Sequence, residues 1–78
     1  MSPTMKNLDQ FLLDVAEVLE VPQVSSDYDF RTSPLWGSMT GFALMVTLEQ
    51  KYGVRISVEE LLAAKTVADL ASLAGVAA

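Results

Sequence analysis

Ser38 is the residue of this sequence whose type and setting offer chemistry most clearly, because it stands between a turn-rich stretch and an apolar one. Serine is a favoured N-cap, since its hydroxyl accepts a hydrogen bond from an unpaired N–H of the first helical turn. The pattern predicts a helix from about Met39 to Tyr52, closed by Gly53 in a left-handed conformation. The hydroxyl of Ser38 should therefore lie on the surface, at the positive end of a helix.

The chain has no residue suited to activate this hydroxyl. It contains no His and no Cys, which excludes Ser–His and Cys–His catalytic pairs, disulfides, and zinc sites built on thiolates or imidazoles. Asp27 and Asp29 are two carboxylates of one loop, which is too few ligands for a cation site. We therefore expect no metal and no catalytic residues, and a protein that is not an enzyme.

Size and charge limit the class further. The 78 residues make one small domain, 1–78, and the start at Met1 suggests a free-standing monomer. The net charge of −5 argues against nucleic acid and anionic membranes as partners. No secretory signal is visible, and no apolar run approaches the roughly 20 residues of a membrane-spanning helix. We expect a cytoplasmic protein.

The elements around Ser38 are all predicted helices. Apolar residues three and four apart indicate a first helix that opens at Ser2-Pro3 or Thr4 and ends before Pro22: Met5, Leu8, Leu12, Val15 and Leu19. Capping boxes begin a short helix at Ser57 and a last helix at Thr66. Gly75 ends the last helix. The fold class is an all-α, four-helix bundle with three longer helices and one short helix.

A long loop, residues 20–36, separates the first helix from Ser38. Loops of this length are uncommon in small domains and are usually functional or tied down. The residues expected to tie it to the bundle are apolar: Val24, Tyr28, Phe30, Leu35 and Trp36. The loop either presents Ser38 or simply crosses between two roughly parallel helices, and both can hold. The helix after it is so apolar that we expect most of it in the core.

The order of these elements, with a Ser at the start of the second helix, resembles an acyl carrier protein over nearly the whole chain. The resemblance is carried by Trp36-Gly37-Ser38-Met39 and by the run 48–56, with support from Asp29-Phe30 and the run 66–70. It implies that Ser38 receives phosphopantetheine from coenzyme A, with Met39 in place of the family's Leu. The thiol of that arm would then hold acyl or aminoacyl groups as thioesters.

The resemblance also implies partners: a phosphopantetheinyl transferase, and acyl- or aminoacyl-loading and condensing enzymes. Gly37 stands where the family usually has an Asp that the transferase recognises. The helix is less acidic than in carriers of fatty acid biosynthesis, which favours polyketide, other secondary-metabolite or specialised lipid biosynthesis. The residues expected to meet partners surround Ser38 and follow one surface of the helix: Trp36, Gly37, Met39, Thr40, Ala43, Thr47 and Gln50. For Trp36, anchoring of the loop is the favoured role.

Gly37 keeps a second interpretation open. Without the acidic residue, the chain could be an unmodified, carrier-like helical module that only binds proteins. Ser38 would then be a helix cap and nothing more, and the apolar helix would be the interface.

Overall fold

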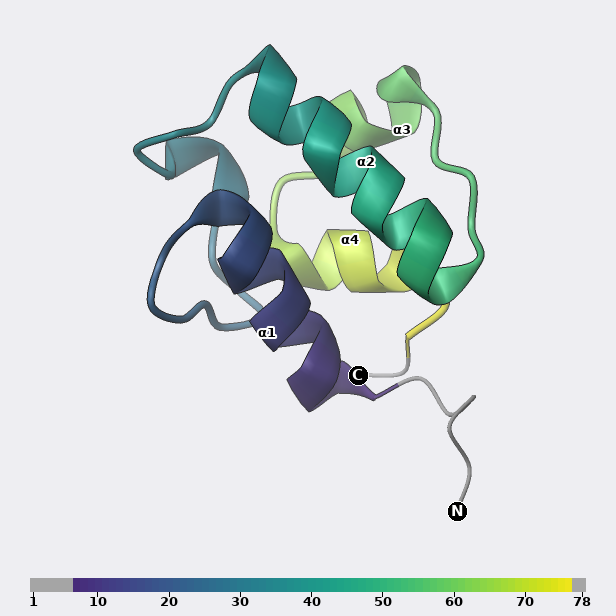
Figure 1. The fold of residues 1–78 in the computed structure, drawn as a ribbon, viewed down its shortest axis with the longest axis horizontal. Helices are drawn as coiled ribbons and strands as arrows, with labels where there is room; N and C mark the ends of the chain where they lie inside the picture. Colours follow the sequence, from purple (N-terminus) through teal and green to yellow (C-terminus); the bar gives the residue numbers. More distant parts are fainter. Residues whose placement is uncertain (1–6, 77–78) are drawn as a thin grey trace.

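A computed structural model describes residues 7–76, and Figure 1 shows their arrangement as a small helical bundle. Within this range there is no strand, and Asp29 and Thr66 form an isolated β-bridge. The all-α, four-helix fold predicted from the sequence is confirmed. The elements in chain order are α1 (Leu8–Leu19), the 3-10 turn η1 (Phe30–Thr32), α2 (Ser38–Tyr52), α3 (Val58–Ala63) and α4 (Val67–Leu73).

One hydrophobic core joins all four helices and the long loop. Its largest fully buried side chains come from α1, α2, α4 and η1: Phe11, Val15, Leu19, Leu44, Leu48, Val67, Leu70 and Phe30. Leu61 adds α3 to the same cluster. Burial of such side chains contributes roughly 1.5–3 kcal/mol each, so the core fixes how the helices sit around Ser38.

Helices α1 and α2 run in opposite directions, as the colours of Figure 1 show. The ring of Tyr52, at the end of α2, packs edge-on against that of Phe11 in the first half of α1, with centroids 5.2 Å apart. The expectation of two roughly parallel helices is therefore wrong. The long loop returns the chain to the same end of the bundle, because Phe30 must enter the core on the way.

The first helix begins later than the sequence predicts, and it ends at Leu19, in agreement with a loop that begins at residue 20. Its N-cap is Asn7, whose side chain accepts a 3.1 Å hydrogen bond from the N–H of Gln10. Ser2, Pro3, Thr4 and Met5, where the helix was expected to open, lie outside the described residues. At the other end Glu20 adopts a left-handed conformation (φ 58°) and stops the helix before Pro22 can.

The loop is held by the first turn of α4. The backbone N–H groups of Val67 and Ala68 donate to the carbonyls of Tyr28 and Ser26, at 3.0 and 2.7 Å. These donors have no partner inside their own helix, so the loop satisfies them. Phe30 is completely buried, as expected, whereas Leu35 is 51% exposed and does not tie the loop down.

Both predicted capping boxes are confirmed, at Ser57–Glu60 and at Thr66–Asp69. The last helix is shorter than expected, with 7 residues against 6 in α3, so the bundle has two long and two short helices. Ala74 ends it, and Gly75 follows with a positive φ of 75°. The short helices leave one side of α2 uncovered near its start.

Candidate functional site

Ser38 is the first residue inside α2, and Gly37 is the N-cap. The carbonyl of Gly37 accepts the first helical hydrogen bond, from Gly41, at 2.8 Å. Gly37 is extended (φ 176°, ψ −175°) and has no side chain, and no side chain caps the helix. The prediction that Ser38 is the N-cap is therefore wrong, because the helix begins one residue earlier than the sequence suggests.

This position leaves the hydroxyl of Ser38 available. The residue is exposed, and its side chain has no hydrogen-bond partner among residues 7–76. The first turn of α2 contains no acidic residue that would offset the positive end of the helix. A hydroxyl in this setting can be esterified, and a phosphate attached to it would lie beside unpaired N–H groups.

The residues just before and just after Ser38 are both held by contacts within the protein. Thr40 donates its hydroxyl proton to the carbonyl of Leu35 at 2.6 Å, so the first turn of α2 holds the end of the loop. Trp36 packs edge-on against the buried Phe30, with ring centroids 5.0 Å apart. The favoured role of Trp36 as an anchor of the loop is confirmed. These contacts keep Ser38 at a constant place on the bundle.

An apolar groove of about 530 Å³ opens beside Ser38, between α2 and α3. Apart from Ser38 and two glycines, its lining consists of apolar side chains: Trp36, Phe42, Met45, Val58, Leu61 and Leu62. Phe42, Val58 and Leu62 are more than half exposed. The sequence analysis missed the contribution of α3, although Val58 and Leu62 are four residues apart and share one face of that helix.

The expectation that α2 is mostly core is wrong for its first half. Gly41, Leu44 and Leu48 form the buried stripe, whereas Met39 is 86% and Phe42 67% exposed. No charged residue occurs between Ser38 and Leu48. The outer surface of α2 is therefore free of charge from Ser38 to Leu48.

The residues expected to meet partners differ in their exposure. Gly37, Met39, Ala43 and Gln50 are exposed along α2 and its cap, and Thr47 is half-buried. Trp36 is also half-buried and lines the groove, and the hydroxyl of Thr40 is used within the protein. Their contacts with partners remain predictions.

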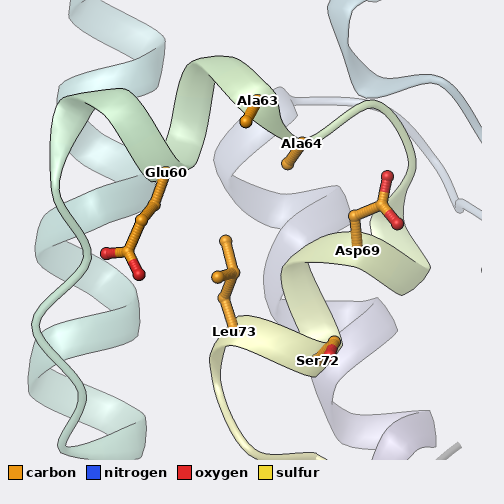
Figure 2. A pocket seen from close by; sticks show the side chains of 6 residues that line it. All are labelled: Glu60, Ala63, Ala64, Asp69, Ser72 and Leu73. Atoms are coloured by element: carbon orange, nitrogen blue, oxygen red, sulfur yellow. The ribbon is translucent and has the colours of Figure 1, made fainter.

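A second hollow, of about 310 Å³, lies between α3 and α4 (Figure 2). Its two carboxylates point away from each other, and both serve capping boxes. Glu60 accepts from the N–H of Ser57 at 2.9 Å, and Asp69 accepts from the N–H groups of Lys65 and Thr66 at 2.9 and 3.1 Å. These hydrogen bonds lower the pKa of Asp69. Both acids of the hollow therefore have structural roles.

The loop carboxylates are likewise engaged. Asp29 forms a bidentate ion pair with Arg31, with N–O distances of 2.8 and 2.9 Å, which lowers the pKa of Asp29. Arg31 therefore pairs with an acid two residues before it in the chain. Asp27 accepts a 2.6 Å hydrogen bond from Ser25. Over the described range, no group of three potential metal ligands gathers in one place.

These features describe a small helical domain with an exposed serine at a helix start. Residues 10–74 match the profile of the phosphopantetheine attachment site family. The chain therefore belongs to that family, the acyl-carrier-type domains, which hold covalent phosphopantetheine and do not catalyse reactions themselves. Neither a curated protein nor a solved structure matches the chain significantly. None of the helices of residues 7–76 has the length and hydropathy to cross a membrane.

Proposed function

We propose that Ser38 is the attachment residue, and that the chain carries acyl groups on its phosphopantetheine arm and delivers them to partner enzymes. The observation that carries this proposal is the exposed, unbonded hydroxyl of Ser38 in the first turn of α2, at the mouth of an apolar groove. The arm supplies the thiol on which an acyl group is held as a thioester. The chain itself positions the arm and leaves Ser38 accessible to enzymes.

In the attachment step, a bond forms between the Ser38 oxygen and the phosphorus next to the pantetheine of coenzyme A. The pyrophosphate bond of coenzyme A breaks, and adenosine 3′,5′-bisphosphate leaves. The hydroxyl proton goes to a base of the transferase, because the first turn of α2 contains no acidic residue and the chain has no His. The resulting phosphodiester carries one negative charge, which the uncapped start of α2 favours.

The neutral surface of α2 bears on the choice of partners. A carrier that binds basic patches on enzymes needs acidic side chains, and α2 has none between Ser38 and Leu48. We expect partners that contact apolar groups instead, centred on the 86% exposed Met39. This supports loading and condensing enzymes of polyketide, other secondary-metabolite or specialised lipid biosynthesis over those of ordinary fatty acid biosynthesis.

The groove favours acyl over aminoacyl cargo. A charged amino group would lose its hydration in a groove lined by Trp36, Phe42 and Leu62, with no acidic residue among its lining to compensate. We propose that the protein works as one domain, as a monomer and in the cytoplasm. A monomer would leave both α2 and α3 open to enzymes.

The test is modification of the intact protein with coenzyme A and a promiscuous phosphopantetheinyl transferase, followed by mass spectrometry. We expect the mass of one phosphopantetheine to be added to the wild type and none to Ser38→Ala. Ser57→Ala is the matched control, because Ser57 also lies at a helix start but is bound in a capping box. Failure of several transferases to modify the wild type would favour the unmodified protein-binding module.

A further inference from the structure

The start of α2 is built differently from the starts of α3 and α4. In α3 and α4 the cap residue and the residue three positions later bond each other's backbone, in the boxes Ser57–Glu60 and Thr66–Asp69. In α2 the cap is Gly37, which has no side chain, and the residue three positions later is Thr40. The reciprocal pair of a capping box is therefore missing from α2.

Thr40 bonds in the opposite direction, to the loop. Its hydroxyl donates a 2.6 Å hydrogen bond to the carbonyl of Leu35, which precedes the cap. This distance is that of a well-formed O–H···O hydrogen bond. Among residues 7–76, no other group bonds the Leu35 carbonyl. The hydrogen bond therefore spans Gly37 and joins the loop to the helix across the missing cap.

Little else holds the link at Gly37. Its N–H has no hydrogen-bond partner among residues 7–76, and its carbonyl accepts only the helical bond from Gly41. A Cβ at position 37 would meet no atom within 4 Å, so no side chain packs on this link. Helix ends fray when their backbone groups have no partners. Apart from the packing of Trp36, the Thr40 hydroxyl is what restrains the first turn of α2 against the loop.

We infer that Thr40 is a positioning residue for arm attachment: its hydrogen bond to Leu35 takes the place of the missing cap and holds Ser38 in the orientation that the transferase binds. The inference rests on the proposed function, in which Ser38 is the attachment residue. Thr40 does not touch the reacting atoms, because Leu35 engages its hydroxyl proton. It acts through alignment, since a misplacement of about 1 Å at a reacting atom can cost roughly 100-fold in rate.

The experiment follows arm transfer from coenzyme A by one transferase at varied concentrations of the full chain, which gives kcat and KM. Thr40→Val keeps the branched shape and removes the hydroxyl, whereas Thr40→Ser keeps the hydroxyl. Tyr52→Phe is the matched control, because it removes a hydrogen bond at the other end of the same helix. The order parameters of the Gly37 and Ser38 amides, from NMR relaxation of the unmodified proteins, are a second readout that needs no enzyme.

We expect Thr40→Val to lower kcat/KM by about 5-fold, mainly through a higher KM, because the binding-competent orientation of Ser38 is populated less. The order parameters of the Gly37 and Ser38 amides should fall from about 0.85 to below about 0.6. Thr40→Ser and Tyr52→Phe should stay within about 2-fold of the wild type, because both keep the hydrogen bond to Leu35.

A double-mutant comparison separates alignment from direct contact with the transferase. Gly37→Asn supplies a side-chain cap, which makes the Thr40 bond redundant for holding the first turn. The effect of Thr40→Val, measured again in the Gly37→Asn protein, should therefore shrink to about 2-fold or less. A contact between Thr40 and the enzyme would be lost equally in both backgrounds.

The outcomes are distinguishable. Failure of the wild type to gain the arm would overturn both the proposed function and this inference. An unchanged kcat/KM in Thr40→Val would overturn this inference alone. So would an equal loss in Thr40→Ser or Tyr52→Phe, unchanged order parameters in Thr40→Val, or a loss that persists in full with Gly37→Asn. If Thr40→Val lacks the circular dichroism of the wild type, Thr40→Ala is judged by the same criteria in its place.

Discussion

The hydroxyl of Tyr52 donates a 2.6 Å hydrogen bond to the carboxylate of Asp14, which joins the end of α2 to the middle of α1. Asp14 is only 5% exposed, and it also accepts hydrogen bonds of 3.1 Å from Gln10 and from Lys51. Burial disfavours the charged carboxylate, but these three donors outweigh it and lower the pKa of Asp14. Burial and the neighbouring charge raise the pKa of Tyr52, which keeps its hydroxyl protonated.

We predict that Tyr52→Phe lowers the free energy of unfolding by about 1–2 kcal/mol, because the buried carboxylate loses a charge-assisted hydrogen bond. Urea unfolding followed by circular dichroism measures the change. Tyr28→Phe is the control, since its hydroxyl makes a longer hydrogen bond, of 3.3 Å, to the uncharged side chain of Ser33. An equal loss in both variants would contradict a special role of the Asp14 contact.

The stabilising effect of Asp14 should be lost at acid pH. Its pKa is lower in the folded protein than the ordinary 3.8, so folding favours the charged form. The contribution is therefore complete above about pH 5 and is lost as the pH falls below 3.8 through the folded pKa. We predict that the stability difference between the wild type and Asp14→Asn shrinks steadily from pH 5 to pH 2. Urea midpoints at several pH values test this, and a constant difference would refute it.

Gly37→Asp should stabilise the protein without its arm by about 0.5–1 kcal/mol. The aspartate would cap the bare first turn of α2 and place a negative charge at its positive end. A Cβ at this position meets no atom within 4 Å, and the extended backbone accepts any residue. Gly37→Asn serves as control, because it supplies the cap without the charge. Thermal unfolding of the three proteins separates the two contributions.

The same variant should be modified faster than the wild type, because the resemblance implies that the transferase reads an acidic residue before the serine. Initial rates of arm transfer at equal protein concentration measure this. Equal rates for Gly37→Asp and the wild type would mean that the transferase does not need the charge here.

Glu20→Gly should also be stabilising, by about 0.5–1 kcal/mol. Glu20 has a φ of 58°, where a side chain costs roughly 1–2 kcal/mol and glycine does not. Part of this gain is lost to the greater freedom of glycine in the unfolded chain. Glu17→Gly, inside α1, is the matched control and should destabilise by about 1 kcal/mol. Urea unfolding shows whether the free energy of unfolding rises or falls in each variant.

The sequence predicted the helices best where a cap is encoded in local residues. Ser57 with Glu60 and Thr66 with Asp69 each form a reciprocal pair within four residues, so the starts of α3 and α4 were correct. The end of α1 at Leu19 agrees with the predicted loop start at residue 20, but the helix is ended by the left-handed conformation of Glu20 and not by Pro22. The start of α2 was placed one residue late, since Gly37 caps without a side chain and Ser38 matches the usual cap.

The groove could not be predicted for a different reason. Phe42 and Met45 were expected in the core because they are apolar. Whether they are buried depends on the distance between α2 and the short α3. That distance is set by tertiary packing of Leu61 and Trp36 around Gly41 and not by any local pattern. The direction of α1 relative to α2 likewise depends on tertiary contacts, such as that between the rings of Phe11 and Tyr52.

The hydrogen bonds from the first turn of α4 to the loop have a consequence for how the protein is made. Tyr28 and Val67 are far apart in the chain, yet the loop that leads to Ser38 has its backbone partners in α4. During synthesis the loop can settle only after residues 67 and 68 have left the ribosome. A modifying enzyme that requires the settled loop would therefore act only after α4 has been made.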